Sequence, residues 1–243
     1  MYSWKTLSRL GVALLCLPLL HLAYLAWGAY AAMSNPSPDT WKPALQRIID
    51  QDQGLRLPSA PVLVTGGHSA RLWTDLPAAI SERPTLLRPL GGATLEDISY
   101  HYDRLIGYYR PSVLIVVPSY SDLHLRDEKT PESLVEALSA LLSRNTALAV
   151  TSRRYVVIPT KTLLHPHDDE RIDEMARASR MLARSLPFTA VLDPNPLLAT
   201  RDGEPNPAYF RSDGINLNDE GYAVLSAMVR KQLIADRLIN APS

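Results

Sequence analysis

In residues 112–117 (SVLIVV), every position after the serine is apolar, and all of these residues except Leu114 are β-branched. A strand buried on both faces has this composition, and such strands occupy the middle of parallel sheets. Further short β-rich runs lie at 62–65, 85–90, 155–158 and 190–192. The run at 112–117 therefore limits the chain to folds that cover a sheet on both faces.

Stretches with helical spacing of apolar residues separate these strands. Thr130, Pro131 and Glu132 have the order of an N-cap, a first-turn proline and a first-turn acid. Asn218 is expected to cap a closing helix. We expect helices at 41–52, at 94–109, from Thr130 onward, at 170–186 and at 218–238. Strands that alternate with helices predict an α/β domain with a doubly wound parallel sheet, whose sites lie at the carboxyl ends of the strands.

The composition excludes several classes of partner. Lysine plus arginine and aspartate plus glutamate both number 25, so no global field draws in nucleic acid. The lone cysteine, Cys16, cannot form an internal disulfide. No motif indicates a nucleotide, a flavin or a structural metal, so we expect no cofactor; the sequence does not identify a protein partner.

Residues 10–33 contain no charged side chain. This is roughly the 20 residues that a helix needs to cross a bilayer. Lys5 and Arg9 precede the run, and the next basic residue is Lys42. The positive-inside rule therefore predicts a single-pass helix in the cell membrane with an extracytoplasmic domain, periplasmic in a Gram-negative cell.

The same run has an alternative interpretation. Residues 29–31 (AYA) resemble a signal-peptidase site, although the apolar stretch exceeds the usual length of a signal peptide. We thus expect an anchor or signal segment at 1–33, a linker and lead-in helix at 34–57, and one domain at 58–243.

Four segments, in order, resemble the sequence blocks of the SGNH (GDSL-type) hydrolases. They are 62–73 (VLVTGGHSARLW), 88–95 (RPLGGATL), 108–123 (YYRPSVLIVVPSYSDL) and 213–222 (DGINLNDEGY). The resemblance implies a flavodoxin-like parallel sheet. It also implies a serine nucleophile after the first strand and a histidine base, oriented by an aspartate three residues earlier. Backbone amides and an asparagine side chain would hold the oxyanion.

The resemblance places other residues at the catalytic positions. His68 stands where the family has its nucleophile, and Asn216 stands where it has its base, whereas Asp213 matches the orienting aspartate. Loss of a nucleophile or base alone can lower kcat about a million-fold in a serine hydrolase. We therefore predict the fold without the usual esterase chemistry.

The oxyanion positions are altered as well. Ser119 replaces the glycine of the third block and Ser121 replaces its asparagine. In the second block, Gly91 or Gly92 remains as a donor of a backbone N–H. A single oxyanion donor raises kcat by roughly a hundred- to a thousand-fold, which does not make up for the loss of both the nucleophile and the base.

Two active alternatives stay open. In the first, Ser69 is the nucleophile, and His124, His165 or His167 is recruited as its base. In the second, a rearranged relay has Asp213 orienting His68 while Ser119 or Ser121 attacks.

Residues 165–169 (HPHDD) look like a metal cluster. We expect the two histidines that flank the proline to point apart, and we find no third spaced ligand. The segment is predicted to be a solvated loop with Asp168 and Asp169 at a helix N-terminus, which the helix dipole favours.

Two functions follow as hypotheses. The first is a membrane-anchored, catalytically degenerate SGNH protein that acts as a binding or scaffold module in an envelope process. The second is an active esterase or acylhydrolase. The resemblance implies an acyl ester or an acylated carbohydrate as the ligand in either case.

Overall fold

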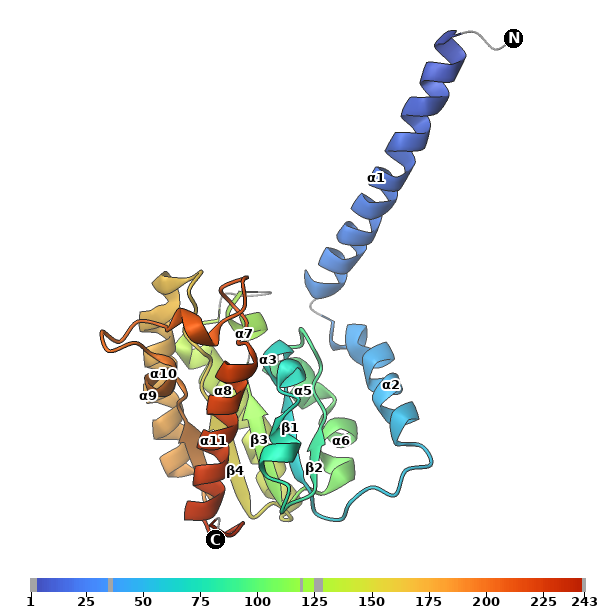
Figure 1. The fold of residues 1–243 in the computed structure, drawn as a ribbon. Helices are drawn as coiled ribbons and strands as arrows, with labels where there is room; N and C mark the ends of the chain where they lie inside the picture. Colours follow the sequence, from blue (N-terminus) through green and yellow to red (C-terminus); the bar gives the residue numbers. More distant parts are fainter. Residues whose placement is uncertain (1–3, 35–36, 119, 125–128, 242–243) are drawn as a thin grey trace.

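The fold is a five-stranded parallel sheet with helices on both faces (Figure 1). The computed structural model describes residues 4–34, 37–118, 120–124 and 129–241. The strand order is β2-β1-β3-β4-β5, the flavodoxin-like order, so the predicted doubly wound sheet is confirmed. The strands are β1 (Val62–Gly66), β2 (Thr85–Leu87), β3 (Val113–Val117), β4 (Arg153–Val157) and β5 (Thr189–Leu192).

The central strands are buried along their whole length. β1 pairs with β3 from Val62↔Val113 to Gly66↔Val117, and every residue of both strands is buried. The apolar run at 112–117 predicted this position. The strand predicted at 85–90 is shorter, because β2 ends at Leu87 before the turn begins.

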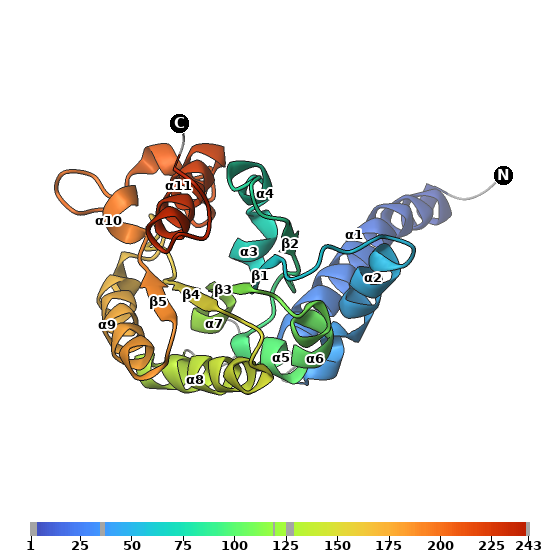
Figure 2. The ribbon, with the colours of Figure 1, turned by 90° about the horizontal axis from the view of Figure 1, so that it is seen from below.

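Each face of the sheet has its own helical layer (Figure 2). Leu114 and Val116 of β3 pack in one core, while Val113 and Ile115 pack in the other. The first layer contains α5 (Leu95–Tyr100), α6 (Tyr102–Leu105), α8 (Pro131–Leu148) and α9 (Asp169–Ser185). The second contains α3 (His68–Leu72), α4 (Leu76–Ala79) and α11 (Asp219–Ala235).

Local capping follows the sequence closely. The Thr130 side chain accepts the N–H of Ser133 at the start of α8, and the Asn218 side chain accepts the N–H of Gly221 at the start of α11.

The remaining short elements are η1 (Pro38–Trp41), η2 (Gly107–Tyr109), α7 (Tyr120–His124), η3 (Pro166–Asp168), α10 (Asn195–Leu198) and η4 (Pro207–Tyr209).

The single helix predicted at 94–109 is wrong, because the segment divides into α5, α6 and η2. His101 interrupts it, with φ −89° and ψ 15°. Its Nε2 lies 2.8 Å from the carbonyl O of Pro38, which belongs to the preceding N-terminal segment. This contact comes from a part of the chain that helical spacing cannot reveal.

The N-terminal helix α1 (Trp4–Ser34) extends away from the sheet (Figure 1). Several of its apolar side chains are exposed, among them Leu14, Leu17 and Trp27. Among the helices of the described residues, none combines the length and the apolar character needed to cross a bilayer. The predicted membrane-spanning helix is thus not found.

The lead-in helix α2 (Lys42–Asp52) packs against the domain. Leu45 is buried in the first core. Asp52 forms an ion pair with Arg88 at 2.5 Å, and Trp41 Nε1 donates to Asp97 at 2.9 Å. These contacts dock the segment that precedes β1 onto Arg88, which follows β2, and onto α5.

Candidate functional site

A glycine turn brings His68 to the carboxyl end of the sheet. β1 ends at Gly66, and α3 begins at His68. A Cβ at Gly66 would lie 2.2 Å from the carbonyl oxygen of Val117, so any larger residue would push β1 away from β3. The close approach of the two strand ends fixes where α3 starts.

His68 is half-buried, and its surroundings disfavour its charged form. Burial lowers the pKa of the imidazole, and Arg71 and Arg211 lower it further. Asp213 acts in the opposite direction and is the weakest of the four influences. A ring with a lowered pKa therefore occupies the position at which the resemblance expects a serine hydroxyl.

The second-block turn keeps both glycines, and each is covered by a side chain. A Cβ at Gly91 would lie 2.6 Å from Cδ of Arg71. Gly92 has φ +95°, and a Cβ there would lie 3.1 Å from the Trp41 ring. The turn is thus maintained by close packing as well as by its backbone conformation.

The last block forms a hydrogen-bonded turn around Asp213. Its Oδ1 accepts the backbone N–H groups of Ile215 and Asn216 at 2.9 and 2.8 Å. Its Oδ2 accepts the side-chain amide of Asn216 at 2.7 Å. Burial acts to raise the pKa of Asp213, but the hydrogen bonds from Asn216 and Ile215 outweigh it, so the pKa is lowered. The aspartate therefore orients Asn216, which stands where the family has its base.

Ser69 faces a cavity of about 20 Å³ that is also lined by Asn216 and Tyr222. Its carbonyl oxygen accepts the Tyr222 hydroxyl at 3.1 Å. A space of this volume holds about one water molecule. Among the described residues, no histidine lines this cavity, and the side chain of His124 is not among those described.

The third block is described only in part. Ser119 lies outside the described residues. The backbone of Ser121 and of His124 belongs to α7, and their side chains are not described. Sequence reasoning missed Asp122, which is buried and accepts the N–H of Leu95 at 2.8 Å. The signal was available, because Asp122 matches the aspartate of the family's Asn-Asp-Leu sequence.

Asp122 lies beside another group that sequence reasoning missed. The Lys129 ammonium is buried, 3.4 Å from Asp122 and also paired with Glu96. A buried carboxylate needs such compensation because desolvation disfavours its charge. This cluster fastens the start of α5 to α7, so it supports the frame of the site.

The loop after β4 brings His165, His167 and Asp168 together. One potential ligand atom from each residue lies within 4.8 Å of the others, and the two imidazole centroids are 5.4 Å apart. The expectation that these histidines point apart is therefore wrong. The reason is local, because Pro166 begins η3, whose tight turn returns His167 to the side of His165.

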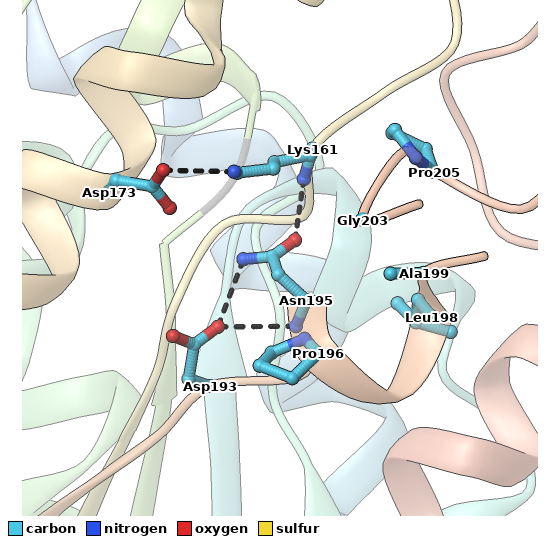
Figure 3. A pocket seen from close by; sticks show the side chains of 9 residues that line it. All are labelled: Lys161, Asp173, Asp193, Asn195, Pro196, Leu198, Ala199, Gly203 and Pro205. Carbon is cyan, nitrogen blue, oxygen red and sulfur yellow. Dashed lines mark hydrogen bonds and ion pairs between the residues drawn. The ribbon is translucent and has the colours of Figure 1, made fainter. Parts of the chain in front are cut away.

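A larger cavity, of about 250 Å³, is lined by Lys161, which follows β4, and by Asp193 and Asn195, which follow β5 (Figure 3). Asn195 accepts the backbone N–H of Lys161 at 2.8 Å and donates to Asp193 at 3.0 Å. The Lys161 ammonium pairs with Asp173 at 2.9 Å. Sequence reasoning missed this network, although Asp193 and Asn195 directly follow the last strand. These polar groups bond mainly to one another.

The structure brings His68, Asp213 and Asn216 to one edge of the sheet but does not connect them as a relay. Among the described residues, Asp213 forms no hydrogen bond to His68, since its bonds go to its own turn. Asparagine has no basic nitrogen to accept a proton. Among the described residues, no chain of hydrogen bonds therefore links His68, Asp213 and Asn216 for proton transfer.

No protein-family model and no curated protein sequence matches the chain. Solved structures do match. A protein reported as a candidate platelet activating factor from Streptococcus pneumonia has a TM-score of 0.70 at 13% identity, covering 88% of this chain and 99% of its own. A GDSL-like lipase from Bacteroides thetaiotaomicron has a TM-score of 0.62 at 13% identity, with 79% and 98% covered.

An enzyme that acts on acetylated sugars matches as well. A variant of an acetyl-xylooligosaccharide esterase from Geobacillus stearothermophilus has a TM-score of 0.55 at 13% identity. The match covers 74% of this chain and 96% of that one. At such identities the likeness concerns the fold alone. The strand order, the position of the four blocks and these neighbours agree: the chain has the fold of the GDSL-like (SGNH) lipases and acylhydrolases.

Proposed function

We propose that this chain is a catalytically degenerate SGNH-fold protein that acts as a binding or scaffold module. One observation carries the proposal: the Asp213 carboxylate holds the Asn216 amide at 2.7 Å, in the position of a general base. A turn that orients a residue unable to accept a proton retains the frame of the site without its reaction.

The surroundings of the two possible nucleophiles support the same proposal. Ser69 faces a one-water cavity that, among the described residues, has no histidine in its lining. His68 receives only a weak electrostatic influence from Asp213 and lies near two arginines. Within the described part of the chain, neither residue has the hydrogen-bonded base and orienting acid that activate a nucleophile.

The ligand we propose is an acyl ester or an acylated carbohydrate. Lipases, acylhydrolases and an esterase of acetylated sugar oligomers share the fold, which supports this class. We further propose that the domain lies outside the cytoplasmic membrane, attached through its N-terminal segment, and serves an envelope process. The uncharged run at 10–33, preceded by Lys5 and Arg9, supports this location.

Hydrolysis of p-nitrophenyl acetate by the full chain tests the loss of catalysis. We expect no activity above the buffer rate for the unaltered chain, for His68→Ala or for Ser69→Ala. A His68→Ser/Asn216→His double variant is the matched control, because it supplies a hydroxyl and an imidazole at the family positions. It should hydrolyse the ester faster than the unaltered chain.

Two outcomes would overturn the proposal. Activity of the unaltered chain that disappears only in Ser69→Ala would make Ser69 a nucleophile. Activity that disappears only in His68→Ala would indicate the rearranged relay.

The location is tested by protease digestion of intact spheroplasts, in which an extracytoplasmic domain is degraded and a cytoplasmic domain is protected.

A further inference from the structure

The three side chains that converge after β4 are of types that bind transition metals. His165, His167 and Asp168 each offer one ligand atom, and these atoms lie within 4.8 Å of one another. The two imidazole planes are inclined at 81°, so the rings meet edge to face rather than in a parallel stack. Imidazole nitrogens and a carboxylate oxygen are typical ligands of zinc.

The orientation of the carboxylate is fixed by a neighbour. Asp168 is buried, and its Oδ1 forms an ion pair with the Arg171 guanidinium at 2.9 Å. Its other oxygen, Oδ2, lies 3.9 Å from Nε2 of His167. The same Arg171 guanidinium donates to the carbonyl oxygen of Leu123 at 3.4 Å, which ties it to α7. Groups that bind the side chain of a metal ligand, as Arg171 binds Asp168, commonly orient that ligand.

The histidines differ in how firmly they are placed. His165 is half-buried, and its ring lies 5.3 Å from that of Tyr120, centroid to centroid. The side chain of His167 is 69% exposed. Ligand atoms around tetrahedral zinc are roughly 3.3 Å apart, given Zn–N and Zn–O distances near 2.0–2.2 Å. Rotation of the exposed His167 side chain can close the remaining gap.

The cluster lies on the rim of the site already described. The backbone N–H groups of Leu163 and Leu164 both donate to the carbonyl oxygen of Gly214, at 2.9 and 3.2 Å. Gly214 follows Asp213 in the last block. The loop that carries the histidines is thus attached to the turn that carries Asp213 and Asn216.

We propose that His165, His167 and Asp168 form a binding site for a divalent transition metal such as zinc. Three protein ligands leave one coordination position for water or for a ligand atom. Arg171 is a positioning residue that holds the Asp168 carboxylate through Oδ1, with Oδ2 on the side of His167. The site does not depend on whether the domain retains esterase activity.

Calorimetric titration of the full chain tests the proposal. The protein is purified in detergent without a histidine tag, treated with a chelator and dialysed, and then titrated with zinc chloride. We expect one ion per chain. His167→Ala should weaken binding at least tenfold, and because this side chain is exposed the variant should fold normally. His21→Ala in α1 is the matched control, since it removes a histidine distant in sequence and should leave the affinity unchanged.

A second variant separates positioning from general damage. Arg171→Ala should weaken zinc binding by about 10- to 100-fold while leaving one ion per chain, the usual effect of losing an orienting partner. Cobalt should give visible absorption bands that shift in His167→Ala. Absence of stoichiometric zinc binding, or equal affinities of His167→Ala and His21→Ala, would overturn the proposal.

Discussion

Two neighbouring segments at the carboxyl edge of the sheet use their polar side chains in opposite ways. In the turn at 213–216, Asp213 directs both oxygens to groups of the same turn. In the loop at 165–168, Asp168 directs one oxygen to Arg171 and the other toward His167. The turn matches a family block and the loop matches none.

The difference separates a turn held by its own hydrogen bonds from the side-chain cluster that we propose as a metal site. Hydrogen bonds within the turn fix the backbone that precedes α11, whatever residue stands at position 216. In the loop, the potential ligand atoms of His165, His167 and Asp168 lie within 4.8 Å of one another. Resemblance to a family block thus indicates which turns keep the backbone conformation of the fold. It does not indicate where other polar side chains, such as those at 165–168, come together.

The largest expected effect concerns zinc affinity. Asp168→Asn should weaken zinc binding by at least about a hundredfold, because an orienting partner alone is worth 10- to 100-fold. Asp213→Asn should leave it unchanged, since Asp213 belongs to the other segment. Competition with a chromophoric chelator measures both affinities. Equal losses in the two variants would show that the turn and the loop form one site.

The next effect concerns stability in the presence of a chelator. Asp213→Ala removes the acceptor of three hydrogen bonds, and we expect a loss of about 1–2 kcal/mol in the free energy of unfolding. The loss is smaller than three buried hydrogen bonds would give, because Asp213 is exposed to solvent. His167→Ala should change it by less than about 0.5 kcal/mol. Urea unfolding followed by circular dichroism tests this ranking, which a larger loss in His167→Ala would reverse.

The smallest effect concerns acid. The pKa of Asp213 is lowered in the folded protein, so its stabilising contribution is present above the ordinary value of 3.8 and is lost as the pH falls through the lower folded value. The stability difference between the unaltered chain and Asp213→Asn should therefore shrink below pH 3.8. In Asn216→Ala the folded pKa of Asp213 should lie closer to 3.8, because a donor to the carboxylate is gone, so the loss should be smaller and complete at a higher pH. Urea unfolding at a series of pH values measures both, and coincident profiles would contradict the role of Asn216.

Much of the fold could be predicted because it depends on local patterns. The apolar run at 112–117 predicted β3, and the caps Thr130 and Asn218 predicted the starts of α8 and α11. Alternation of strands and helices was enough for a parallel sheet, since short crossovers allow few other arrangements. The four blocks correctly predicted the SGNH fold and placed Asp213 three residues before Asn216.

Tertiary contacts decided the rest. The break at His101 depends on Pro38, and the cover over Gly92 depends on Trp41, both far away in the sequence. The histidines at 165 and 167 converge because η3 turns the chain and Arg171 fixes Asp168. Sequence periodicity records which residues are buried within one element. It does not record which side chains from separate turns meet, because that depends on how the packed layers orient the loops.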